Sequence, residues 1–147
     1  MRRAFRRTVR GIAVRLSPGE VEILGALPAL LLAVDPDEPA ADRLDPTVYP
    51  DDPGADAAYR DLTRGMLEEA RTRDRSELAV TLGNDVLTTE EADAWLRVIG
   101  EARLVLAARL GIDEDGWERH AAGDEPVEMS LLRLLGALQE DLVSALL

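Results

Sequence analysis

Residues 88–111 read TTEEADAWLRVIGEARLVLAARLG and carry the clearest local structural signal in the chain. Thr88 is followed three residues later by Glu91, the capping-box pattern in which each side chain satisfies the backbone N–H of the other. An apolar face then follows at helical spacing: Ala92, Trp95, Ile99, Ala102 and Leu106. Gly111 supplies the position just past a helix at which glycine commonly ends it. The stretch therefore predicts an amphipathic helix that begins after Thr88 and closes at Leu110-Gly111.

A second capping box starts another helix at Ser17. The Ser17 hydroxyl can accept the N–H of Glu20, and Pro18 suits the first helical position. We expect this helix to run to about Val34 and to kink at Pro28, because proline removes one helical hydrogen bond and crowds the preceding turn.

A third helical pattern begins at Asp52-Pro53. Its apolar residues share one face: Ala55, Tyr59, Leu62, Met66 and Ala70. We expect it to fray in the charged run 71–75. Residues 77–82 fit a short helix or an extended segment, and Gly83-Asn84 marks a turn.

The last helix is predicted over Met129 to Leu147. Six leucines form its apolar face: Leu131, Leu134, Leu135, Leu138, Leu142 and Leu146. Leu132, Val143 and Leu147 fall outside that face. The pattern fits a buried bundle helix and also the seam of a homodimer.

Residues 5–16 predict a β-hairpin. Apolar residues alternate on its return strand, where Ile12, Val14 and Leu16 should face the core, and Arg10-Gly11 makes the turn. The fold class is therefore mainly α, with four main helices in a bundle-like core and a small N-terminal hairpin. We expect one domain, 1–147, with the arginine-rich hairpin at 1–16, a helical body at 17–147 and an acidic, proline-rich loop at 35–53.

Charge is unevenly distributed along the chain. The first 15 residues hold six arginines and no acid, which leaves 11 arginines against all 29 acids elsewhere, a net charge of −18. Such asymmetry points to an interaction surface, for a partner or a nucleic acid. The candidate contact residues are Arg2, Arg3, Arg6, Arg7, Arg10, Arg15, Arg60 and Arg64. The alternative is that these arginines pair with the chain's own excess acids.

The sequence offers no catalytic, cofactor or metal site. It contains neither cysteine nor lysine, which excludes thiolate, disulfide and Schiff-base chemistry within this chain. His120 is the single histidine and lacks an orienting partner. The acidic clusters, such as Asp113 to Asp115, do not match a calcium loop and fit solvated acids better. The apolar run 23–34 is 12 residues long, short of the ~20 that span a bilayer. We expect a cytoplasmic protein without a membrane segment.

Taken together, several short motifs resemble an actinobacterial family known as a domain of unknown function. These motifs are Phe5-Arg6-Arg7, Tyr49-Pro50-Asp51-Asp52, Tyr59-Arg60-Asp61-Leu62-Thr63, Leu87-Thr88 with Glu90-Glu91 and Trp95-Leu96, and Leu138-Gln139-Glu140-Asp141-Leu142. The resemblance covers essentially the whole chain and implies no enzyme activity. Similar proteins are encoded beside the Clp protease adaptor and genes of a cysteine pathway, and some are described as stress-responsive transcription regulators. The resemblance therefore implies a regulatory role. Because this chain contains no cysteine, however, it cannot sense oxidant by a thiol switch.

The leading hypothesis is a cytoplasmic, non-enzymatic regulator that binds another protein. The alternative is a DNA-binding regulator that uses the arginine-rich hairpin. A weaker third hypothesis is an enzyme whose site is assembled from scattered aspartates and arginines.

Overall fold

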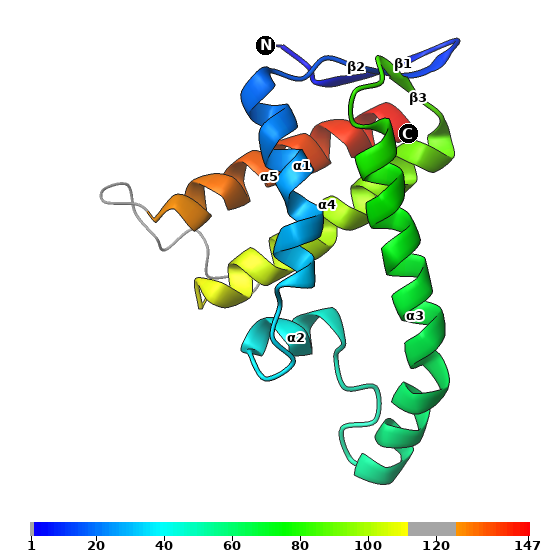
Figure 1. Cartoon of the computed structure of the whole chain (residues 1–147), viewed down its shortest axis with the longest axis vertical. Coiled ribbons are helices and arrows are strands. Elements are labelled where there is room, and N and C mark those ends of the chain that lie inside the picture. Colours follow the sequence, from blue (N-terminus) through cyan, green and yellow to red (C-terminus); the bar gives the residue numbers. More distant parts are fainter. Residues whose placement is uncertain (1, 112–125) are drawn as a thin grey trace.

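The computed structural model describes residues 2–111 and 126–147. Over these ranges the elements are, in chain order, β1 (Phe5–Thr8), β2 (Gly11–Val14), α1 (Pro18–Leu32), α2 (Pro39–Leu44), α3 (Pro53–Thr81), β3 (Val86–Leu87), α4 (Thr89–Arg109) and α5 (Val127–Leu146). Four long helices and a small N-terminal sheet confirm the predicted fold class. The sheet covers one end of the helices (Figure 1).

Helix α4 is the centre of the molecule, because it packs against α1, α2, α3 and α5 and also against β2 and β3. Both bonds of its capping box are present: the Glu91 N–H donates to Thr88 Oγ1 at 3.1 Å, and the Thr88 N–H donates to Glu91 Oε1 at 2.8 Å. Every residue of its predicted apolar face is buried. Gly111 follows the helix with φ of 69°, a conformation that glycine adopts without strain.

Helix α1 begins as the sequence predicts. The Ser17–Glu20 capping box is formed, and Pro18 occupies the first turn. Its buried residues Leu24, Leu27 and Leu31 face the core. The helix ends at Leu32, two residues before the predicted end.

The prediction of an acidic loop over residues 35–53 is wrong in one respect, because this stretch contains helix α2. Pro39 starts this helix, where its missing N–H costs nothing, and Ala40 is completely buried where α2 packs on α4. A six-residue helix with one buried alanine gives too weak a periodic signal to distinguish it from a loop.

Helix α3 does not fray at 71–75; it is continuous to Thr81, so residues 77–81 are helical. The charged run is an ion-pair network against α4. Arg97 of α4 donates to both carboxylate oxygens of Asp74, at 2.8 and 2.9 Å, and Arg75 donates to Glu101 at 2.9 Å. Bidentate, charge-assisted bonds of this kind compensate for the burial of Asp74, which is 8% exposed. The charges therefore hold α3 in place where the sequence predicts a break.

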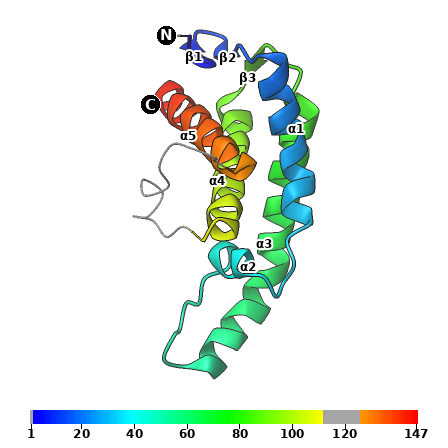
Figure 2. The ribbon, with the colours of Figure 1, turned by 90° about the vertical axis from the view of Figure 1, so that its left-hand side faces the viewer.

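The N-terminal half of α3 extends beyond the rest of the protein, as Figures 1 and 2 both show. Its predicted apolar face is not in the core: Leu62 is 80% exposed and Met66 is 74% exposed. Leu78 and Thr81, in the other half, are buried.

Trp95 joins three elements at the end of the core below the sheet. Its indole packs edge-to-face against Phe5 of β1, with centroids 6.1 Å apart, and its Nε1–H donates to Thr81 Oγ1 of α3 at 2.7 Å. The Thr81 hydroxyl in turn donates to the Glu77 carbonyl at 2.6 Å. The buried indole is thereby fully satisfied.

The sheet has three antiparallel strands in the order β1-β2-β3. The predicted hairpin is therefore extended by β3, a strand that the sequence pattern did not predict. The register pairs Thr8 with Gly11, which makes Val9-Arg10 the two-residue turn and corrects the predicted Arg10-Gly11. Gly11 is still required: its φ is 134°, and a Cβ there would lie 2.4 Å from the Leu87 carbonyl oxygen of β3. Ile12 faces the core, and Val14 and Leu16 pack against its edge, as predicted.

Helix α5 is amphipathic, but its buried face is rotated from the predicted one. Its buried residues are Met129, Leu132, Leu135, Leu138, Leu142 and Ala145. Leu132 is therefore in the core, whereas Leu131, Leu134 and Leu146 are only partly buried. The rotation arises because α5 packs on α4 and also against β1. These tertiary contacts cannot be predicted from helical periodicity alone.

Reciprocal polar contacts attach the hairpin to α5. Asp141 Oδ2 accepts the backbone N–H groups of Ala4 at 2.6 Å and Phe5 at 3.1 Å. In the other direction, Arg7 donates to the carbonyls of Ala145 at 3.0 Å and Leu146 at 2.7 Å, at the negative end of the helix dipole. These contacts set the position of the sheet.

The contact at Asp141 can be tested by Asp141→Ala, which leaves two partly buried N–H groups without their acceptor. We expect the free energy of unfolding to fall by about 1–3 kcal/mol, measured by urea denaturation. The matched control is Glu140→Ala, because the neighbouring Glu140 is exposed; it should change the free energy by about 0.5 kcal/mol or less. Equal losses in the two variants would contradict this role for Asp141.

Candidate arginine surface

The outer face of the sheet carries a hollow lined with arginines. It has a volume of about 300 Å³ and is lined by Arg2, Arg3, Ala4, Arg6, Ala13 and Arg15. We call the hollow formed by these six residues the arginine hollow. It brings together four of the six arginines of the hairpin region.

The alternation of the strands produces this surface. Phe5 and Ile12 face inwards and are 1% and 2% exposed, so Arg6 and Ala13 face the solvent. Arg6 and Ala13 are direct cross-strand partners. Because the alanine side chain is a single methyl group, it leaves an open floor between the longer arginine side chains. The predicted Arg10-Gly11 turn would have placed Ala13 opposite Thr8, so the sequence did not reveal its pairing with Arg6.

The arginines of the hairpin region divide into engaged and unengaged groups. Arg2 forms an ion pair with Glu20 at 2.6 Å, and Arg7 is bound to α5. Arg3, Arg6, Arg10 and Arg15 are exposed and form no hydrogen bond or ion pair with any residue in the described ranges. Arg10 lies in the hairpin turn, outside the hollow. The hollow therefore presents three uncompensated guanidinium groups, which are suited to bidentate binding of carboxylates or phosphates.

The other two candidate residues lie elsewhere. Arg60 is engaged within the protein, by Asp56 Oδ2 at 3.0 Å and the Asp45 carbonyl at 2.9 Å. Arg64 is exposed. Both belong to the projecting half of α3, at the end of the molecule opposite the sheet (Figures 1 and 2). The structure does not bring them together with the hairpin arginines.

Glu20 is the acid that borders the arginine hollow. Burial raises the pKa of its carboxyl, but hydrogen bonds from the Ser17 N–H and the Arg2 guanidinium together outweigh this, so the pKa lies below its ordinary value of 4.5. The carboxylate is thus held ionised and pairs with Arg2, while Arg3, Arg6 and Arg15 form no ion pair with it.

The lowered pKa of Glu20 predicts how this corner of the protein responds to acid. Since the folded-state pKa lies below the unfolded one, the stabilisation from Glu20 is complete above about pH 4.5 and is lost as the pH falls through the folded value. An NMR titration of the Glu20 carboxyl carbon should show this midpoint below 4.5. In Arg2→Ala the midpoint should rise towards 4.5, whereas Arg10→Ala should leave it unchanged; a midpoint at or above 4.5 in the unaltered protein would contradict the arrangement.

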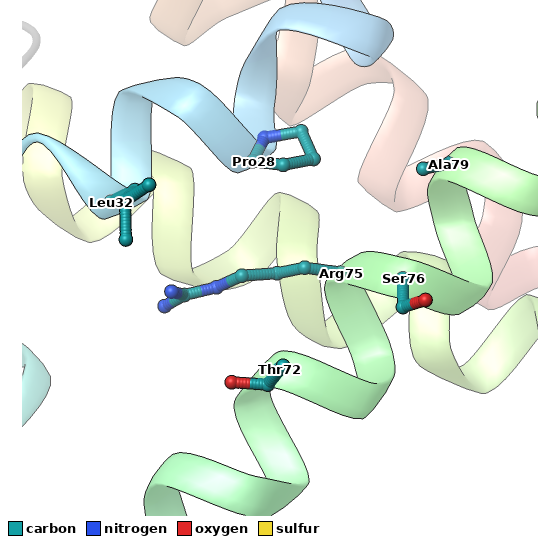
Figure 3. A pocket seen from close by; sticks show the side chains of 6 residues that line it. All are labelled: Pro28, Leu32, Thr72, Arg75, Ser76 and Ala79. Carbon is teal, nitrogen blue, oxygen red and sulfur yellow. The ribbon is translucent and has the colours of Figure 1, made fainter.

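A second hollow, of about 290 Å³, lies between α1 and α3 (Figure 3). Pro28 and Leu32 of α1 form one side, Thr72, Ser76 and Ala79 of α3 form the other, and Arg75 extends between the two helices. The Arg75 guanidinium is engaged with Glu101, so this hollow presents no uncompensated charge.

Within residues 2–111 and 126–147, no three histidine, cysteine, aspartate or glutamate side chains are grouped as a metal site. In the same part of the chain, no helix combines the length and apolar character needed to cross a bilayer. His120, Trp117 and the acids 113–115 lie outside the described residues, so their predicted solvation stays a prediction.

Residues 2–146 match a family model described as "Domain of unknown function (DUF2017)", and the chain belongs to this family. A curated protein of Mycobacterium leprae (strain TN), named "Putative oxidative stress regulator AosR", is 34% identical to the chain over 111 residues. The alignment covers 72% of this chain and 51% of that protein, so the chain spans about half of its length. No solved structure matches the chain.

Proposed function

We propose that this chain is a cytoplasmic, non-enzymatic regulatory protein that works by binding another protein through the arginine hollow. The observation that carries the proposal is that Arg3, Arg6 and Arg15 lie together on one face without an acidic partner in the described ranges, whereas Arg75 and Arg97 pair with acids of the same chain. The name of the M. leprae relative supports a regulatory role connected with oxidative stress.

The partner surface that this site fits is acidic. Three guanidinium groups around a small, open floor can each bind a carboxylate, and Arg side chains are enriched at protein interfaces. The net charge of −18 on the rest of the chain favours a protein with a local acidic segment over a long polyanion, because an extended polyanion would be repelled beyond the hollow.

Charge reversal of the hollow tests this proposal. Tagged wild-type protein, Arg6→Glu/Arg15→Glu and the control Arg10→Glu/Arg64→Glu would be used to capture proteins from lysate, with quantification by mass spectrometry. The control reverses the same number of exposed, unpaired arginines away from the hollow. We expect at least one protein to be recovered about tenfold less by the hollow variant than by the other two. Identical captures by all three proteins would contradict the proposal.

DNA binding is the second candidate, because phosphates could occupy the same three guanidinium groups. Removal of residues 1–15 is not a clean test, since it would also remove Phe5 and Ile12 from the core. The two double variants above preserve these residues.

For DNA binding, fluorescence anisotropy of a labelled duplex would be measured over a salt series. Each arginine that contacts a phosphate contributes about −0.9 to the slope of log affinity against log salt, so Arg6→Glu/Arg15→Glu should flatten the slope by about 2 while Arg10→Glu/Arg64→Glu leaves it unchanged. Absence of binding at low salt, or equal slopes for the two variants, would exclude this candidate.

A further inference from the structure

The outer face of the hairpin places two arginines and two alanines on opposite diagonals. Arg6 is the direct cross-strand partner of Ala13. Two residues further along β1 and β2, the Arg15 N–H donates to the Ala4 carbonyl at 2.8 Å, so these two residues face each other as well. Arg6 and Arg15 are therefore diagonal neighbours, which lie about 7–8 Å apart in antiparallel sheets. The two alanines occupy the other diagonal and form the floor between the arginine side chains.

This placement brings positive charges together without an acid between them. Neither Arg6 nor Arg15 forms an ion pair with any residue in the described ranges, and Arg3 adds a third such charge to the same hollow. Like charges on neighbouring positions of a sheet repel, which opposes folding. An anion bound in the hollow, in contrast, is attracted by all three guanidinium groups.

Guanidinium groups around one small hollow favour an anion with more than two oxygens. A carboxylate has two oxygens, and a single guanidinium fork engages both of them. A phosphate monoester has three terminal oxygens around a tetrahedral centre and carries a charge of about −1.5 to −2 at pH 7. Two or three forks can therefore bind one phosphate group from different sides. Its charge also offsets most of the positive charge of the hollow.

The acids around the hollow favour one concentrated negative charge over an extended acidic segment. Glu20 borders the hollow as the partner of Arg2. Asp85 is exposed and directly precedes Val86, the β3 partner of Ala13. A row of carboxylates or of nucleic-acid phosphates would extend beyond the hollow, where these acids and the rest of the acidic chain repel it. A single phosphate group keeps its charge inside the hollow, whose volume of about 300 Å³ accommodates it.

We propose that the arginine hollow binds a phosphorylated serine or threonine side chain of the partner protein. Arg6 and Arg15 engage the phosphate oxygens from the two strands, and Arg3 engages them from the segment before β1. The methyl groups of Ala4 and Ala13 contact the apolar part of the phosphorylated side chain. This inference rests on the proposed function, because it concerns the same site and the same partner. It adds that binding depends on the phosphorylation state of that partner.

The first test measures the binding of short blocked peptides by isothermal titration calorimetry at low salt. The peptides carry a central phosphoserine, serine or glutamate between glycines, so that only the side chain differs. We expect the phosphoserine peptide to bind at least about tenfold more tightly than the glutamate peptide, and the serine peptide not to bind. Absence of binding by the phosphoserine peptide at about 20 mM, or equal affinities for phosphoserine and glutamate, would overturn the proposal.

Variants then separate the guanidinium forks from their charge. Arg6→Gln/Arg15→Gln should weaken binding of the phosphoserine peptide at least about tenfold. The matched control Arg10→Gln/Arg64→Gln removes two exposed arginines outside the hollow and should leave the affinity unchanged. Arg6→Lys/Arg15→Lys keeps the charges without the forks, so it should lose most of the preference for phosphoserine over glutamate. Equal affinities of the Gln variant and its control, or full preference in the Lys variant, would contradict the proposal.

The second test repeats the capture from lysate with and without prior treatment of the lysate with a broad-specificity phosphatase. We expect the protein recovered through the hollow to be lost after treatment. Recovery that survives the phosphatase but is lost in Arg6→Glu/Arg15→Glu would overturn phosphate recognition and leave the proposed function standing. Duplex DNA that binds wild type but not Arg6→Gln/Arg15→Gln would assign the hollow to nucleic acid and would overturn the proposal as well. Identical captures by all proteins would contradict the proposed function itself.

Discussion

The buried indole of Trp95 is the contact on which the relation between helices and sheet depends. It lies on the central helix α4, forms a T-shaped pair with Phe5 of β1 and donates its single N–H to Thr81 of α3. Three elements from distant parts of the sequence are therefore positioned by one side chain, which is completely buried. In a chain with only 3% aromatic residues, the remaining core is built mainly from leucine and alanine, and these side chains specify orientation less strongly than a ring with a polar atom.

The arginines perform two different tasks in this acidic protein. Arg71, Arg75, Arg97 and Arg109 connect elements of the fold by pairing with acids, whereas Arg3, Arg6 and Arg15 are left to the solvent on the sheet. Of the candidate arginines, Arg2 and Arg60 pair with acids of the chain, whereas Arg3, Arg6, Arg10, Arg15 and Arg64 pair with no acid in the described ranges. Because these guanidinium groups are exposed, dissolved salt weakens their attraction for an acidic partner.

The features that local sequence could predict were those determined by neighbouring residues. Both capping boxes, the buried face of α4 and the inward residues of the hairpin depend on spacings of two to four residues. The missed features depend on contacts between distant segments. The charged run 71–75 predicts a break in helix α3, because its ion-pair partners Arg97 and Glu101 lie on another helix. The buried face of α5 differs from the predicted one because this helix also contacts β1. The arginine hollow was anticipated as a set of hairpin residues, but its separation from Arg60 and Arg64 required the length and direction of α3.

The attachment of the hairpin to α5 has a consequence for the order in which the molecule is assembled. The contacts of Ala4, Phe5 and Arg7 with α5 join residues 136 to 139 positions apart. Contacts between residues so far apart in the sequence require a long loop to close, so we expect them to form after the local contacts of the helices. Without α5, the hairpin would keep its pairing with β3 and the contact of Phe5 with Trp95, but it would lose these hydrogen bonds. The position of the arginine face therefore depends on a helix that is distant from it in the sequence.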